Sequence, residues 1–198
     1  MQTATPLSLE TTVELYETVK QLLIQAPLFR PRMPKSGVPF QYEMSNCGDY
    51  GWVADKNGYY YTMVNQFMDN QPWPEMPQLI KDIAIEAAHQ NNFELQPQTC
   101  LINVYRTNQQ LGLHQDNTEQ NLTAPVISIS LGCDGVFAVG GMRYTDPTRD
   151  VILHNGDVIL LGGASRLQYH AMKGIVLGTS PIPELNNQRI NLTIRQVV

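Results

Sequence analysis

The chain has 198 residues, of which 42% are hydrophobic and 16% are charged, and its formal net charge at pH 7 is −5. This length and composition are those of one globular domain and exclude a disordered chain. The acidic balance excludes a protein whose whole surface attracts nucleic acid, so such binding would require a local basic patch.

Residues 8–26 are predicted to form an amphipathic helix. Ser8 is a suitable N-cap, and Pro27 opposes continuation of the helix. Apolar residues recur at three- and four-residue steps, which predicts one buried face. The residues of this predicted face are Leu9, Val13, Tyr16, Val19 and Leu23.

Residues 27–77 are rich in Pro, Gly, Asn and Tyr and include both tryptophans, Trp52 and Trp73. The apolar runs here predict only short strands, near residues 40–45 and 59–63. A long, aromatic, turn-rich stretch within a domain is often a binding element, and the alternative is a cover over the core. It also holds a basic cluster that could be a local patch for nucleic acid, although charge alone favours a solvated loop. The cluster consists of Arg30, Arg32 and Lys35.

Residues 79–90 predict a second helix, and after residue 96 the pattern changes to short β-branched or aromatic runs separated by Gly, Asn and Asp. Two helices followed by many short strands indicate an α+β fold. The number of strands favours a double-stranded β-helix, or jelly roll, backed by helices. Without an internal repeat or linker, we expect one domain over residues 1–198, with the β core in residues 97–198.

The cysteines and the first residues indicate where the protein resides. The three cysteines have no zinc-finger spacing, and an odd, sparse count argues against a disulfide framework. The start, MQTATPLSLETT, lacks the basic and apolar regions of a signal peptide, and no run approaches the ~20 apolar residues of a membrane span. We expect a cytoplasmic, monomeric protein without a membrane partner.

A metal-binding pattern is found in the segment LHQD. In an extended chain, residues i and i+2 point to the same side, so His114 and Asp116 can face one ion. His170 is the candidate for a third ligand. Two imidazoles and one carboxylate with open positions form the facial triad of non-haem Fe(II) oxygenases. A zinc hydrolase can use the same ligand types.

The last predicted strand, RINLTIR, has a polar and an apolar face. The polar face consists of Arg189, Asn191, Thr193 and Arg195. Two arginines on one face are costly unless an anion pairs with them, and a guanidinium can hold a carboxylate at two points. In LINVY, Asn103 and Tyr105 also share a face and could reach a dicarboxylate. A solvent-facing strand is the alternative, and a zinc hydrolase would not explain the arginine pair.

These motifs together closely resemble the bacterial AlkB family of DNA and RNA dealkylating dioxygenases. The matching stretches keep the family order over most of residues 42–196. They are NCGDYGW, GYYYT, QPWPEMP, CLINVY, LHQDNTE, APVISISLG, FAVGG, NGDVILLGGASRLQYH and RINLTIRQ. The resemblance implies a jelly-roll fold whose N-terminal extension, here about residues 27–77, is a nucleotide-recognition lid.

The resemblance also implies the role of each site residue. His114, Asp116 and His170 would bind Fe(II). The far carboxylate of the co-substrate 2-oxoglutarate would pair with Arg189, helped by Asn103 and Tyr105, while Asn191 and Arg195 would support its metal-bound end. Trp52 and Tyr59 would line the pocket for an extruded base.

The departures from the family pattern concern the substrate. Thr118, followed by Glu119, stands where the well-known bacterial member has an acidic residue that contacts the base. Tyr144, beside Arg143, replaces a lid arginine used on the substrate, and Leu161 replaces a tryptophan near the co-substrate. These positions affect base preference rather than the reaction.

The implied reaction is oxidative dealkylation of bases such as 1-methyladenine and 3-methylcytosine in DNA, or alternatively in RNA. It would consume O₂ and 2-oxoglutarate and release succinate, CO₂ and an aldehyde. The alternatives are a 2-oxoglutarate-dependent hydroxylase of a protein or small molecule, and a non-catalytic jelly-roll binding module.

Overall fold

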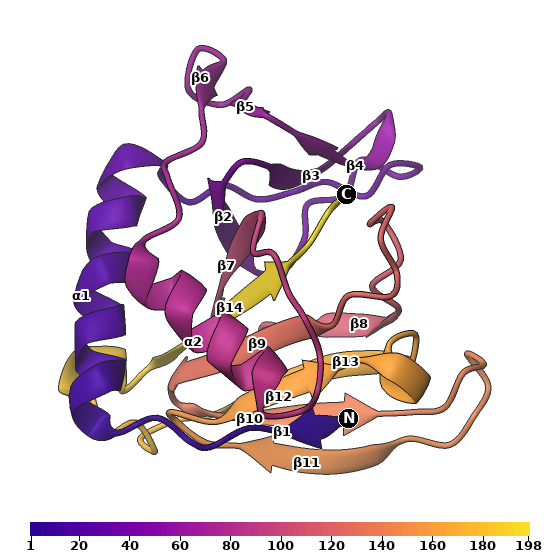
Figure 1. The fold of residues 1–198 in the computed structure, drawn as a ribbon. Coiled ribbons are helices and arrows are strands. Elements are labelled where there is room, and N and C mark those ends of the chain that lie inside the picture. Colours follow the sequence, from indigo (N-terminus) through magenta and orange to yellow (C-terminus); the bar gives the residue numbers. More distant parts are fainter.

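Two antiparallel β-sheets pack against each other in the computed structural model, which describes residues 1–198 (Figure 1). The larger sheet has the order β1-β12-β9-β14-β7-β2, with bounds Gln2–Thr3, Val158–Leu161, Val126–Gly132, Gln188–Arg195, Thr99–Arg106 and Glu43–Gly48. The smaller sheet has the order β11-β10-β13-β8, with bounds Arg149–Leu153, Asp134–Val139, His170–Val176 and Leu111–His114. The predicted helix-backed jelly roll is confirmed.

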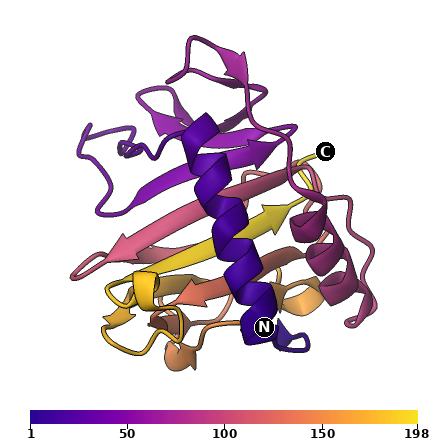
Figure 2. The ribbon, with the colours of Figure 1, turned by 90° about the vertical axis from the view of Figure 1, so that its left-hand side faces the viewer.

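The two helices cover the outer face of the larger sheet (Figure 2). They are α1, Leu9–Gln25, and α2, Gln78–His89, close to the predicted ranges. The Ser8 side chain caps α1 by accepting a hydrogen bond from the Thr11 amide at 3.1 Å. A cluster of 24 buried residues joins the helices to this sheet. A second cluster takes side chains from both sheets, so the space between them is also a packed core.

The predicted buried face of α1 was wrong at two positions. Leu9 and Val13 are 52% and 40% exposed. Val19 is buried as predicted, and the other buried residues of the helix are Thr12, Leu15 and Leu22. Thr12 can be buried because its hydroxyl donates to the Leu9 carbonyl at 2.9 Å and accepts from the Asn155 amide at 3.0 Å. Burial of a hydroxyl costs little free energy when the hydroxyl is hydrogen-bonded. Apolar periodicity could not reveal the hydrogen bond between Thr12 and Asn155.

Residues 27–77 contribute both to the core and to a separate segment, residues 51–72, which we call the lid after its predicted role. The predicted strand at 40–45 is β2, Glu43–Gly48, which joins the larger sheet beside β7. The lid holds the hairpin of β3, Gly51–Asp55, and β4, Gly58–Thr62, and a short pair, β5, Val64–Asn65, with β6, Gln71–Pro72.

Side-chain hydrogen bonds tie the β3–β4 hairpin to β2, and a close contact packs it against Trp73. The Asn46 side chain bonds the Trp52 backbone twice, each at 3.0 Å. A Cβ at Gly51 would lie 2.1 Å from the Trp73 ring, so glycine allows that close approach.

Neither helix combines the length and the apolar character that crossing a membrane requires.

Candidate active site

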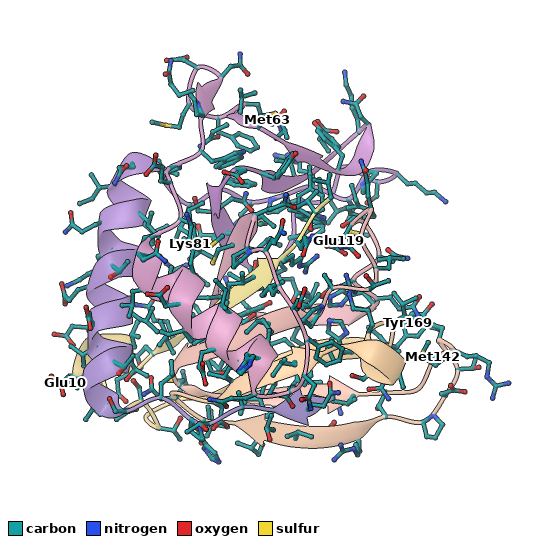
Figure 3. All side chains as sticks on the ribbon, in the orientation of Figure 1. Glu10, Met63, Lys81, Glu119, Met142 and Tyr169 are labelled. Carbon is teal, nitrogen blue, oxygen red and sulfur yellow. The ribbon has the colours of Figure 1, made fainter.

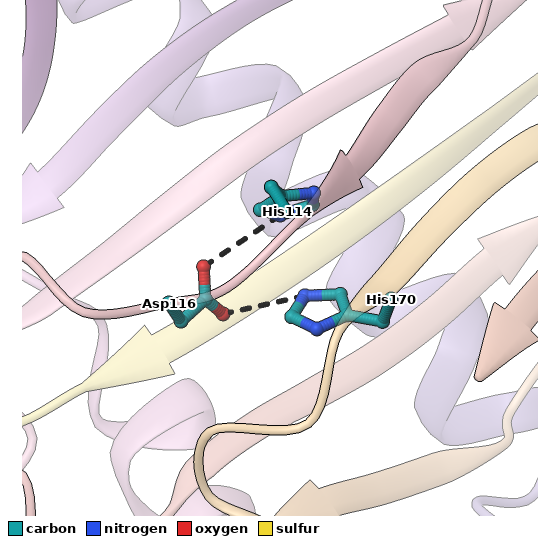
Figure 4. Close-up of side chains that lie close together, drawn as sticks. All are labelled: His114, Asp116 and His170. Carbon is teal, nitrogen blue, oxygen red and sulfur yellow. Dashed lines mark ion pairs between the residues drawn. The ribbon is translucent and has the colours of Figure 1, made fainter. Parts of the chain in front are cut away.

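His114, Asp116 and His170 come together at the mouth of the sandwich (Figure 4). His114 ends β8, His170 begins β13, and the two residues are direct cross-strand partners. Asp116 follows β8 by two residues. One potential ligand atom from each residue lies within 4.8 Å of the others. The prediction that His114 and Asp116 of the segment LHQD face the same site is thus confirmed, with His170 as the third residue of the group.

Backbone carbonyls orient both imidazoles. His114 Nδ1 lies 2.8 Å from the Gly112 carbonyl, and His170 Nδ1 lies 3.0 Å from the Gln168 carbonyl. The Nδ1–H groups donate there, which leaves each Nε2 free to bind a metal. These Nε2 atoms face the two oxygens of Asp116 at 3.7 and 3.6 Å.

The ionisation of these groups suits a cation. Burial, followed by the neighbouring His170, lowers the pKa of His114 to about 4, so this ring is neutral at pH 7. Burial opposes ionisation of Asp116, but Arg195 and the two imidazoles outweigh it and hold the pKa of that carboxyl well below its usual range. Neutral imidazole and carboxylate are the forms that ligate metals, and two histidines with one carboxylate are the donor set of non-haem Fe(II) sites. The residues present therefore fit Fe(II).

A network of buried ion pairs supports Asp116. Arg195 donates to Asp116 Oδ1 at 2.7 Å and to Glu119 Oε1 at 2.7 Å. Arg166 donates to Glu119 Oε2 at 2.9 Å and to the Asp116 carbonyl at 2.5 Å. Tyr61 donates its hydroxyl to Glu119. Sequence reasoning missed Glu119, Arg166 and Tyr61 as site residues. The sequence signal that could have indicated the acidic member, Glu119, was Arg195, because a buried arginine requires an anionic partner.

A cavity extends from the triad into the sandwich. Its polar lining includes Asn103, Ser128, Asn191 and Thr193, and its apolar lining includes Leu161. The alternation expected on β7 and β14 is therefore confirmed: Asn103 and Asn191 are register partners and both face inward.

Arg189 is buried in the sandwich and does not itself line this cavity. It is paired in register with Tyr105, which does line the cavity, and it is fully buried. Its guanidinium donates to Leu153 and Cys133 carbonyls, each at 3.1 Å, and to Ser130 Oγ at 2.6 Å. It forms no ion pair, and its Nε has no hydrogen-bond partner.

A buried cation without a counter-ion is unusual. Burial lowers the pKa of Arg189 to about 10, which leaves it charged at pH 7. Arg195 is paired with two carboxylates, so Arg189 is the arginine of β14 that has no anionic partner.

A second pocket of about 330 Å³ opens beside the metal ligands. Trp52 and Tyr59 line it and stack on each other, with ring centroids 5.6 Å apart. Thr118 and Asn117 also line it. Arg143 and Tyr144 lie elsewhere, exposed on the loop between β10 and β11, where Arg143 bonds Asp146 at 2.9 Å. The structure does not bring these two residues to the pocket.

Comparison with known proteins agrees with this geometry. Residues 7–195 match the model of the 2OG-Fe(II) oxygenase superfamily. The chain is 37% identical over 184 residues to the alpha-ketoglutarate-dependent dioxygenase AlkB of Escherichia coli K12. The matched region covers 92% of this chain and 83% of that protein. It is 36% identical over 110 residues to the DNA N(6)-methyladenine demethylase ALKBH1D of Arabidopsis thaliana, covering 51% of this chain and 25% of that protein.

A solved structure shows the same fold. The structure of OsALKBH1 superposes with a TM-score of 0.84 at 28% identity, covering 98% of this chain and 99% of that one. The triad, the buried arginine and these similarities agree on one assignment. The chain belongs to the AlkB family of Fe(II)- and 2-oxoglutarate-dependent dioxygenases.

Proposed function

We propose that the protein removes alkyl groups from nitrogen atoms of bases in DNA, with 1-methyladenine and 3-methylcytosine as typical substrates and RNA as a second target. The observation that carries this proposal is the aromatic pocket beside the triad, which is large enough for a base and opens directly onto His114 and Asp116. The AlkB and DNA demethylase relatives support it.

Arg189 is proposed to bind the far carboxylate of 2-oxoglutarate, with Tyr105 and Asn103 beside it. The support is its buried, unpaired charge. Asn191 is proposed to face the metal-bound end. Arg195 has both terminal nitrogens occupied by Asp116 and Glu119, so we propose that it supports this end by holding Asp116 in place.

The bound Fe(II) and 2-oxoglutarate would supply the activation of O₂ and the oxidation of the alkyl carbon. The protein's part is to position the base. An alkyl group within a stacked duplex cannot reach the triad, so the substrate must be single-stranded or have its base flipped out. Stacking on Trp52 would offset the lost base stacking by roughly 1–3 kcal/mol. Thr118 and Asn117 add uncharged hydrogen-bonding groups to the lining of the pocket.

A Gly135→Ala substitution tests the position of Arg189. A Cβ at Gly135 would lie 2.7 Å from Arg189 Nε, so the guanidinium must shift away from its present hydrogen bonds. We expect the Michaelis constant for 2-oxoglutarate to rise about 10-fold or more, as expected when a charged hydrogen bond is weakened. Gln21→Ala on α1 is the control, because Gln21 is exposed and lines neither the cavity at the triad nor the aromatic pocket. Equal Michaelis constants in wild type and Gly135→Ala would contradict this position for the co-substrate.

The proposed activity is tested with oligonucleotides carrying 1-methyladenine, 3-methylcytosine or N6-methyladenine, in DNA and in RNA. After incubation with Fe(II) and 2-oxoglutarate, mass spectrometry should show loss of the methyl group with an equal amount of succinate. Succinate without any demethylated oligonucleotide would indicate a protein or small-molecule hydroxylase. Absence of succinate under all conditions would indicate a non-catalytic module.

Trp52→Ala tests the pocket in the same assay. We expect kcat/KM for the methylated oligonucleotide to fall roughly 5- to 150-fold, the equivalent of one base–aromatic stack. The slow conversion of 2-oxoglutarate without substrate should stay unchanged. Phe67→Ala is the matched control, because Phe67 is an exposed lid aromatic that stacks on Phe29 and does not line the pocket. Loss of both activities in Trp52→Ala would instead indicate a structural role.

A further inference from the structure

The β3–β4 hairpin carries Trp52 and Tyr59, so its position decides whether the aromatic pocket is formed. Most side-chain hydrogen bonds of the hairpin stay within the lid or join it to β2. Tyr60, for example, donates to Asp55 in the same hairpin at 2.9 Å. Tyr61 is the one hairpin residue whose side chain hydrogen-bonds the catalytic β core.

The contacts of Tyr61 lead directly to a metal ligand. Its hydroxyl donates to Glu119, Arg195 bridges Glu119 Oε1 and Asp116 Oδ1 at 2.7 Å each, and Arg195 also donates to the Tyr61 oxygen at 3.3 Å. Arg166 closes the ring through Glu119 Oε2 and the Asp116 carbonyl. In Figure 3 Glu119 lies between the lid and the β-sandwich.

The burial of this network makes its members depend on one another. The Glu119 side chain is 0% exposed, and those of Arg166, Arg195 and Asp116 are 4%, 7% and 7% exposed. The two carboxylates balance the two guanidiniums, so no member can move without leaving a buried charge unpaired. A cation that binds the Asp116 carboxylate therefore alters the ion pair between Asp116 and Arg195. Through Glu119, it also alters the hydrogen bond of Tyr61.

We propose that Tyr61 and Glu119 are positioning residues that couple the order of the β3–β4 hairpin to occupancy of the metal and 2-oxoglutarate site through Arg195. Coupling of this kind is reciprocal. If an ordered hairpin raises the affinity of Asp116 and the other ligands for metal, metal binding must stabilise the ordered hairpin by the same free energy. The loaded site would then complete the base pocket before nucleic acid binds. That consequence rests on the proposed function, whereas the coupling itself does not.

Hydrogen exchange of the hairpin tests the coupling without any substrate. Peptides covering residues 51–62 are followed by mass spectrometry, with and without Mn(II) and 2-oxoglutarate, and calorimetry verifies Mn(II) binding. In wild type we expect exchange to slow about 5-fold or more, the lower end of typical couplings. In Tyr61→Phe, which removes one oxygen and keeps the ring, slowing should be under about 2-fold. Tyr60→Phe is the matched control on the same strand and should behave as wild type.

Equal slowing in wild type and Tyr61→Phe would overturn the proposal. So would unchanged exchange in wild type with Mn(II) bound, or an equal loss of slowing in Tyr60→Phe. Because no oligonucleotide is present, these outcomes are independent of the demethylation assay. Failure to demethylate any base would refute the proposed substrate and leave the coupling standing.

Discussion

Asp116→Ala is expected to reduce turnover of 2-oxoglutarate to background and to abolish Mn(II) binding measured by calorimetry. The substitution removes the carboxylate of a three-ligand group, and two imidazoles alone hold a divalent cation weakly. Wild type should also melt at a higher temperature when Mn(II) is added, because a ligand that binds the folded state stabilises it. The variant should lose that increase.

The stability of the variant must be separated from its chemistry. Asp116 is also a partner of Arg195, and breaking a buried ion pair costs at most about 3–5 kcal/mol. Glu119 remains on Arg195, so we expect a folded protein with a lower melting temperature. Asp116→Asn, which keeps the shape, is the second variant, and Asp82→Asn on α2 is the control. Normal succinate formation coupled to demethylation in Asp116→Ala would show that the ligand assignment is wrong.

Arg189→Lys should raise the Michaelis constant for 2-oxoglutarate roughly 10- to 150-fold, because a hydrogen bond to a charged group contributes about 1.5–3 kcal/mol. Lysine keeps the positive charge and loses the planar fork that grips a carboxylate at two points. Titration with 2-oxoglutarate at saturating Fe(II) measures this directly. The effect should fall on co-substrate binding, while Mn(II) binding at the triad remains.

The control for Arg189→Lys is Arg106→Lys, an exposed arginine paired with Glu43. Exposed ion pairs contribute little, so its Michaelis constant should match wild type. An unchanged constant in Arg189→Lys would mean that the buried charge has a structural role and that the far carboxylate binds elsewhere.

Local pattern predicted the parts of this site that lie on single strands. The i, i+2 spacing of His114 and Asp116 and the polar face of β14 follow from strand geometry alone. The Ser8 cap and the range of α2 were also predictable, because capping and apolar periodicity are local. That His170 lies beside His114 could be predicted only from the family resemblance of the whole set of motifs, because spacing alone does not specify which strands become neighbours.

The parts that sequence could not predict depend on contacts between distant segments. Tyr61 and Glu119 are 58 residues apart and meet only because the hairpin folds over the β core. Arg195 was expected beside the co-substrate, yet two carboxylates already occupy its terminal nitrogens. The buried face of α1 was wrong because Thr12 has a partner in Asn155, 143 residues away.

A crystal structure with Mn(II) and 2-oxoglutarate bound tests the central claim most directly. We expect the metal between Nε2 of His114, Nε2 of His170 and a carboxylate oxygen of Asp116, with the far carboxylate of the diacid within hydrogen-bond distance of the Arg189 guanidinium. A metal ion bound without any one of these three residues, or a diacid whose far carboxylate lies away from Arg189, would contradict it.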